Sequence, residues 1–162
     1  SGAIPPSLIV QADQDFFMRG LAAAAALVHG RNSAEQPTSS QRRRLIATRG
    51  VATSEPVAGQ AHALYWNPQG IPVETALAQL GVAEGDVAVI GGTGIFGLFL
   101  PLYAKFQLTR VPNVRLPGGR PVFPGVPSQT PEALLSAAGL RPVSTEMLDA
   151  GRNVSVVTWQ RL

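Results

Sequence analysis

The sequence predicts an α/β fold whose sheet is mostly parallel, with an antiparallel hairpin at its C-terminal edge. Segments with the composition of strands alternate with segments of helical pattern along most of the chain, and this order is typical of parallel sheets. The stretch 87–101, VAVIGGTGIFGLFLP, places a run of buried-strand type directly before glycines and a short helix. Two final strand-like segments, Arg141–Leu148 and Val154–Arg161, flank a turn at 149–153 and predict the hairpin.

The first half of the chain predicts a helix, three strands and a second helix. Asp13 and Asp15 suit the start of a helix that runs to about Ala25, because carboxylates near a helix N-terminus cap free N–H groups and complement the dipole. The apolar segments that follow predict strands at Ala26–His29, Arg44–Thr48 and Ala63–Trp66. An amphipathic helix at Val73–Leu80 is closed by Gly81.

In the second half, the apolar run Val87–Ile90 is expected to be the central strand, buried on both faces. A short helix follows at Ile95–Leu100, and the alternating segment Phe106–Val111 predicts a further strand. A last short helix spans Glu132–Ala138 and precedes the hairpin.

Composition indicates one globular domain of 162 residues, since 45% of the residues are hydrophobic and 14% charged. There is no apolar run of 18 residues and no signal-peptide pattern, so we expect a cytoplasmic protein that does not bind a membrane. The sequence has no cysteine and two histidines, which makes a metal site an unfavourable interpretation.

The net charge of +3 has one basic run, Arg42-Arg43-Arg44, with no aromatic residue beside it. Nucleic-acid binding is therefore not expected, because it favours a basic stripe interleaved with aromatics. The run predicts contact with a small phosphorylated or carboxylated ligand, or else a solvated turn.

The glycines after the Val87–Ile90 strand predict an anion site. Glycine lets the backbone approach a phosphate closely, and a helix N-terminus adds unpaired N–H groups. The alternative is a tight turn that needs glycine only for a positive φ. A Rossmann domain is a further alternative, but Leu98–Pro131 contains no Asp or Glu to hold a ribose.

Several segments together resemble the dihydrofolate reductase family. IGGTGIFGLFLP, followed by FQLTRV and then VFP, is similar to the second half of these enzymes, and VHGRNS at 28–33 resembles their Gly-Arg motif. Asp13, four residues before Phe17, matches their acidic residue and active-site aromatic. The resemblance covers about 13–123 and includes the reductase domain of riboflavin biosynthesis. It implies a three-layer α/β/α arrangement.

The resemblance implies NADPH as cofactor. Residues in three turns would hold it: Gly30, Arg31, Asn32 and Ser33 at the phosphates; Ala47, Thr48 and Arg49 at the adenosine and its 2′-phosphate; Gly91, Gly92, Thr93, Gly94, Ile95 and Phe96 at the pyrophosphate and nicotinamide.

The same resemblance implies a catalytic carboxylate and a substrate pocket. Asp13 would be catalytic and hydrogen-bonded towards Thr109, while a helix cap is its alternative role and Asp15 its rival. Phe17, Arg42, Ile90 and Thr109 would contact the substrate, with Arg42 at a carboxylate of the folate tail.

We therefore expect an NADPH-dependent reductase of a pteridine, above all of dihydrofolate to tetrahydrofolate, as in one-carbon metabolism. The alternatives are a pyrimidine reductase of the riboflavin-biosynthesis type, acting on 5-amino-6-ribosylaminouracil phosphate, and a non-catalytic nucleotide-binding module of the same fold. A homodimer is a possible assembly. Only twelve residues precede Asp13, so the comparison predicts a single domain over 1–162 that lacks the family's first strand and loop.

Overall fold

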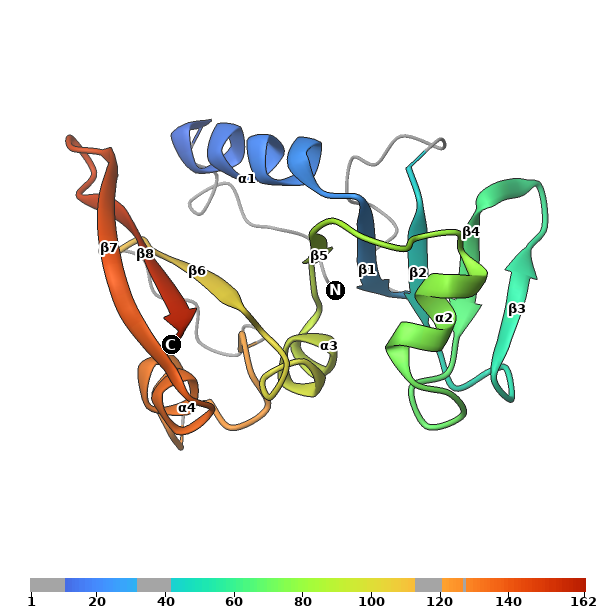
Figure 1. The fold of residues 1–162 in the computed structure, drawn as a ribbon. Coiled ribbons are helices and arrows are strands. Elements are labelled where there is room, and N and C mark those ends of the chain that lie inside the picture. The colour runs from blue at the N-terminus through green and yellow to red at the C-terminus, as the bar shows by residue number, and fades with distance from the viewer. Residues whose placement is uncertain (1–10, 32–41, 113–120, 127) are drawn as a thin grey trace. The chain divides into compact units, whose positions relative to one another are not determined.

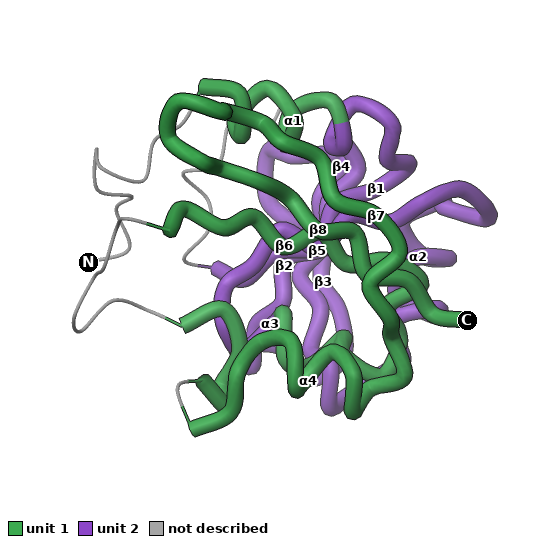
Figure 2. The backbone as a smooth tube through the Cα atoms, turned by 90° about the vertical axis from the view of Figure 1, so that its left-hand side faces the viewer, with its two compact units in different colours: residues 1–19, 96–162 green, residues 20–95 purple. Residues whose placement is uncertain are grey.

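The structure is a computed structural model that describes residues 11–31, 42–112, 121–126 and 128–162. It is a mixed α/β protein with one mostly parallel sheet and one antiparallel sheet (Figure 1), as the sequence predicts. The chain divides into two compact units (Figure 2). Unit 1 contains residues 1–19 and 96–162, and unit 2 contains residues 20–95. No helix of the described ranges is long and apolar enough to cross a membrane.

Unit 2 contains a five-stranded sheet with the order β3-β4-β2-β1-β5. Its strands are β1 (Ala26–Gly30), β2 (Arg44–Ala47), β3 (Ser54–Val57), β4 (Gln60–Trp66) and β5 (Val87–Val89). All neighbours pair in parallel except β3, which is antiparallel to β4. Every residue of β2 and the first four of β1 are buried, which is typical of parallel strands covered on both faces.

The strand β5 differs from the prediction for Val87–Ile90. It stands last in the order of its sheet, not at the centre, and among the described residues it pairs only with β1. Its three residues are half-buried, and only the following Ile90 is buried. The apolar run correctly indicates a strand, but composition alone does not say which strands flank it.

The helix α2 (Val73–Gln79) ends as its sequence predicts. Gly81 adopts a φ of 85°, which favours glycine, and the N–H groups of Gly81 and Val82 bond back to Ala78 and Leu77. The strand β3 is absent from the prediction, and it contains Pro56, a residue that is unfavourable inside a strand. Since β3 is the edge strand of its sheet, the missing N–H of Pro56 costs no ladder hydrogen bond there.

Unit 1 contains a three-stranded antiparallel sheet with the order β6-β8-β7. Its strands are β6 (Lys105–Arg110), β7 (Leu140–Asp149) and β8 (Val154–Arg161). The predicted hairpin is confirmed as β7–β8, and β8 also pairs with β6. The helix α4 (Pro131–Ala137) precedes the hairpin, and the Thr130 hydroxyl caps it by accepting from the N–H of Ala133.

Aromatic rings form much of the core of unit 1. Phe123 is fully buried, and its ring packs 5.2 Å from that of Phe106 and 6.4 Å from that of Phe96. Tyr103 packs 5.2 Å from Phe106 and donates its hydroxyl to the Phe96 carbonyl at 2.9 Å. Burial raises the pKa of Tyr103 far above its usual value, so this hydroxyl stays a donor. The cluster fixes the start of β6, the strand that carries Thr109.

Two helices contain residues of both units. The helix α1 (Gln11–Ala23) has its first residues in unit 1 and its last in unit 2, and α3 (Thr93–Leu98) passes from unit 2 into unit 1. Asp13 lies in the first turn of α1 and is not its cap.

Candidate functional site

In unit 2, the ends of two adjacent strands bring the predicted glycines together. The N–H of Gly30, at the end of β1, donates to the Gly91 carbonyl at 2.9 Å, and the N–H of Ile90 donates to the Val28 carbonyl at 3.0 Å. Gly91 has a φ of 113°, which a side chain would rarely adopt, and the Gly91–Gly92 peptide bond is cis. Ile90, predicted to contact substrate, is buried in the unit.

Gly92 and Gly94 adjoin open space. A Cβ built on either residue would have no described atom within 4 Å, whereas one on Gly30 would lie 3.6 Å from Ile95. Packing within unit 2 therefore does not explain glycine at positions 92 and 94. This arrangement leaves the backbone of the turn accessible to a molecule that approaches it closely.

The turn after β2 lies beside the residue that follows β1. The Thr48 hydroxyl accepts from the Gly50 N–H at 3.0 Å, and a Cβ on Gly50 would be 3.7 Å from a guanidinium nitrogen of Arg31. Arg31 and Arg49 are both exposed. Two cations thus lie at the carboxyl ends of β1 and β2, where parallel sheets usually bind ligands.

The other predicted cofactor residues have varied positions. Ala47 is buried at the end of β2, and Thr93, Gly94 and Ile95 form the first turn of α3. The ring of Phe96 packs in the aromatic core of unit 1. Asn32 and Ser33 lie outside the described residues, so their predicted role stays a prediction.

In unit 1, Asp13 and Thr109 form the hydrogen bond that the resemblance implies. The Thr109 hydroxyl on β6 donates to a carboxylate oxygen of Asp13 at 2.8 Å, and both side chains are half-buried. The rival Asp15 is exposed and accepts from Gln11 at 2.8 Å within the same helix. The geometry therefore favours Asp13 as the held carboxylate.

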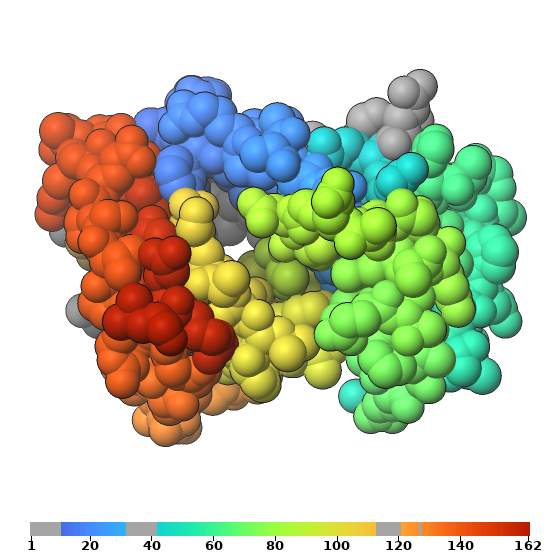
Figure 3. Space-filling view, viewed as in Figure 1, coloured from blue at the N-terminus to red at the C-terminus, as the bar shows by residue number. Residues whose placement is uncertain are grey.

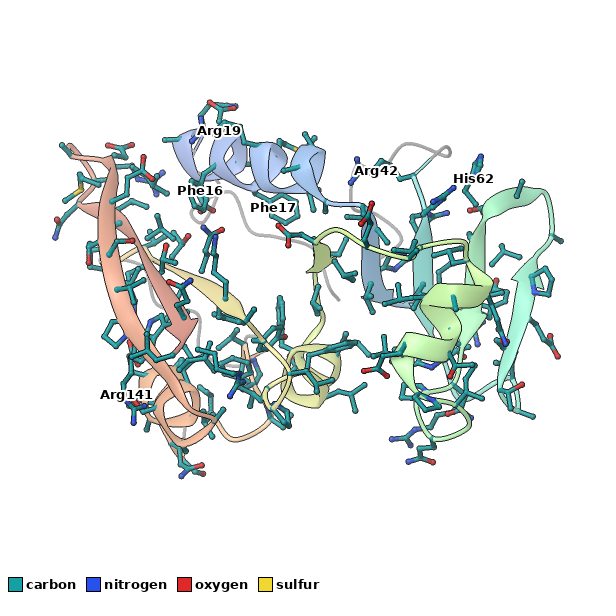
Figure 4. The ribbon with its side chains drawn as sticks, in the orientation of Figure 1. Phe16, Phe17, Arg19, Arg42, His62 and Arg141 are labelled. Carbon is teal, nitrogen blue, oxygen red and sulfur yellow. The ribbon has the colours of Figure 1, made fainter. Side chains whose placement is uncertain are left out.

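Two phenylalanines follow Asp13 on α1. Phe17 lies one helical turn after it and is half-buried, so the two share a face of the helix. Figure 4 shows Phe16 and Phe17 on one side of α1, with Arg19 towards the other. The Arg19 guanidinium nevertheless lies 5.9 Å from the centre of the Phe16 ring. The contact of Phe17 with a substrate stays a prediction.

The solved structures that match this chain include two reductases that are similar to it over nearly its whole length. Dihydrofolate reductase from Enterococcus faecalis, solved as a complex with NADP(H), matches with a TM-score of 0.62 and 19% identity, covering 99% of this chain and 89% of that one. The chain has a dihydrofolate reductase-like fold. The deaminase/5-amino-6-(5-phosphoribosylamino)uracil reductase from Thermotoga maritima matches with a TM-score of 0.59 and 16% identity, covering 93% of this chain and 49% of that one. No family model and no curated protein sequence matches.

The dihydrofolate reductase-like fold replaces the Rossmann alternative. The glycine turn resembles a dinucleotide fingerprint, but nearly the whole chain matches a dihydrofolate reductase structure and the chain ends in the antiparallel β7–β8 hairpin. The missing acidic residue between Leu98 and Pro131 is consistent with that outcome.

The basic run does not form a single patch. Arg42 donates to the carbonyls of Leu21 and Ala24 at the end of α1, and Arg43 donates to Gly81 at 3.0 Å. Arg44 is buried. Figure 4 shows Arg42 near the start of β2. Each guanidinium thus bonds to the protein itself, and the contact of Arg42 with a substrate carboxylate stays a prediction.

A buried polar group that the sequence did not indicate lies in the same sheet. Arg44 points one guanidinium nitrogen at His29 Nε2, 3.3 Å away, and another donates to the Gln60 carboxamide. His29 Nδ1 donates to the Gly30 carbonyl at 2.9 Å, so Nε2 is the acceptor that faces Arg44. Burial, and then the charge of Arg44, lower the pKa of His29 despite the opposing effect of the Gly30 bond. His29 is therefore neutral at pH 7.

Proposed function

We propose that the chain is an NADPH-dependent reductase that transfers hydride to a pteridine-type substrate, with dihydrofolate as the first candidate. The hydrogen bond from Thr109 to Asp13 carries this proposal. In a fold shared with two reductases, it holds a carboxylate one helical turn from an aromatic side chain.

The carboxyl-end turns of unit 2 fit a dinucleotide phosphate. Gly92 and Gly94 have space for close backbone approach, and Arg31 and Arg49 supply positive charge beside the Thr48 turn. Arginine pairs strongly with phosphate oxygens, which supports NADPH over NADH as the molecule held. NADPH, when bound, supplies the hydride.

Asp13 would hold and orient a proton for the substrate. A carboxylate anchored by a hydroxyl donor keeps one oxygen fixed and leaves its other lone pairs free to contact a substrate N–H. Phe17, on the same helix face, would pack against the substrate ring, which excludes water from it.

The riboflavin-type reductase is the second candidate because its likeness is nearly as close, with TM-scores of 0.59 and 0.62. That substrate carries a phosphate instead of a folate tail. Since the Arg42 guanidinium bonds to Leu21 and Ala24, unit 2 offers no direct evidence for the folate tail over the alternative. The two substrates must therefore be tested side by side.

The experiment measures oxidation of NADPH by the purified chain with dihydrofolate and with 5-amino-6-(5-phosphoribosylamino)uracil in separate reactions. Calorimetry with NADPH and NADH supplies the cofactor affinities. Turnover of one substrate that is lost in Asp13→Asn, with NADPH affinity unchanged, would support the proposal. NADPH binding without turnover of either substrate would instead support the non-catalytic module.

A further inference from the structure

A cavity in unit 2 lies at the opposite end of the sheet from the glycine turns. It is a surface hollow open to solvent, with a volume of about 500 Å³, within the range of small-molecule sites. Its walls come from the β3–β4 hairpin and the end of α2, whose surfaces adjoin in the space-filling view (Figure 3). Gln60 begins β4, and the carboxyl end of that strand is ~20 Å away at the usual rise per residue. The cavity is therefore separate from the proposed cofactor site.

The wall is partly apolar and partly made of carboxamides. Val57, Ala63, Leu64 and Leu80 supply apolar surface, and Gln60 and Gln79 supply polar atoms. Such a mixture suits a small molecule with an apolar body and one polar group.

The two carboxamides both present donors. A guanidinium can only donate, so the Gln60 oxygen faces Arg44 and its NH₂ group remains for a ligand. The Gln79 oxygen accepts from the Ser54 hydroxyl, which likewise leaves its NH₂ group. Within the described part of the chain, neither NH₂ group has an acceptor.

A buried positive charge stands directly behind Gln60. Arg44 is 8% exposed and has two contacts, the neutral imidazole of His29 and the neutral carboxamide of Gln60. Its Nε has no hydrogen-bond partner among the described residues. No carboxylate of the described ranges forms an ion pair with it. A buried charge without a counter-charge is unfavourable, and the bond to Gln60 polarises that carboxamide towards the cavity.

A second cation is near the other end of the wall. The Arg43 guanidinium donates to the carbonyl of Gly81, the residue after Leu80. We propose that this cavity binds a small organic carboxylate with an apolar body, through the NH₂ groups of Gln60 and Gln79 and the positive charge of Arg44.

The test uses benzoate as the probe, with benzamide as its neutral analogue and benzamidine as its cationic one. Titrations of the ¹⁵N-labelled full chain follow the side-chain NH₂ signals of Gln60 and Gln79. We expect a benzoate Kd of roughly 10 mM or tighter, for a molecule of this size. Benzoate should bind about five- to tenfold more tightly than benzamide, because donors bond more strongly to a charged acceptor.

The decisive variant is Gln60→Glu, which keeps the shape of the side chain and gives Arg44 a charged partner. Benzoate affinity should fall at least ~10-fold, and benzamidine should become the preferred probe. Gln129→Glu in unit 1 makes the same change in net charge at an exposed residue and should leave benzoate affinity within ~2-fold. If Gln60→Glu fails to fold, Gln79→Glu replaces the other wall donor with a charged acceptor at an exposed residue, and benzoate affinity should again fall.

Three results would overturn the proposal. The first is equal binding of benzoate and benzamide, the second is benzoate affinity unchanged by the decisive variant, and the third is shifts confined to residues outside the cavity wall.

Discussion

The Asp13–Thr109 pair supports a double-substitution experiment that separates a chemical role from an orienting one. Asp13→Asn keeps the oxygen that accepts from Thr109 at 2.8 Å but removes the charge. Turnover should fall by ~10²-fold or more, which corresponds to about 2.7 kcal/mol in the barrier. NADPH affinity should change less than ~2-fold, because the glycines and arginines proposed to hold the cofactor phosphates are in unit 2.

Thr109→Val removes the donor and keeps the side-chain shape. A hydrogen bond to a charged group contributes about 1.5–3 kcal/mol, and we take the low end because both side chains are half-exposed. Turnover should therefore fall roughly tenfold. If Thr109 acts only through the carboxylate, the double variant should be no slower than Asp13→Asn alone, within ~2-fold.

The assay is steady-state NADPH oxidation with each candidate substrate, together with calorimetry of NADPH for each variant. Losses that multiply in the double variant would show that Thr109 acts independently of Asp13 and would refute the orienting role. Turnover unaffected by Asp13→Asn would refute the chemical role as well.

Three further predictions concern unit 2. Gly92→Ala should lower NADPH affinity at least ~10-fold without loss of folding, since the added Cβ meets no described atom. Gly20→Ala, where the added Cβ is equally unobstructed, should leave NADPH affinity unchanged. If calorimetry shows the same NADPH affinity for both variants, Gly92 is not part of the cofactor site. Because the pKa of His29 is lowered in the folded state, the unfolded chain binds more protons at this residue. The free energy of unfolding should therefore fall as pH drops below about 6.5, by at most about 1.4 kcal/mol per pH unit. Urea denaturation at several pH values should show this pH dependence of the free energy of unfolding in the parent chain, and the dependence should be lost in His29→Gln. If the variant keeps the same pH dependence, His29 is not its source. Arg49→Ala should remove most of a roughly tenfold preference for NADPH over NADH. The control Arg43→Ala, at another exposed arginine, should retain that preference. If the preference survives in both variants, the 2′-phosphate binds elsewhere.

The sequence predicted elements well where a local pattern determines them. The apolar segments before Gly30 and Gly91 became β1 and β5, and the segments around the 149–153 turn became the β7–β8 hairpin. Asp13 and Thr109 are 96 residues apart in the chain, and only the resemblance to a family could pair them.

Other features depend on neighbours that a single sequence does not reveal. The position of β5 at the end of the described strand order follows from strand pairing and not from its own composition. Pro56 is compatible with β3 only because that strand is an edge. Arg44 is expected at the surface by its charge, yet His29 on β1 and Gln60 on β4 provide the acceptors that let it be buried.

The division of the chain into two units sets an order of assembly during synthesis. Every strand pairing of the five-stranded sheet that the structure describes lies within residues 20–95, so this sheet can form while the ribosome is still making the remainder. The three-stranded sheet must wait, because its middle strand β8 is made after both strands that flank it. Asp13 leaves the ribosome 96 residues before Thr109, a delay of roughly 5–20 s at ordinary translation rates. During that interval Asp13 has no Thr109 hydroxyl to accept from, so their hydrogen bond can form only after the strands of the five-stranded sheet have left the ribosome.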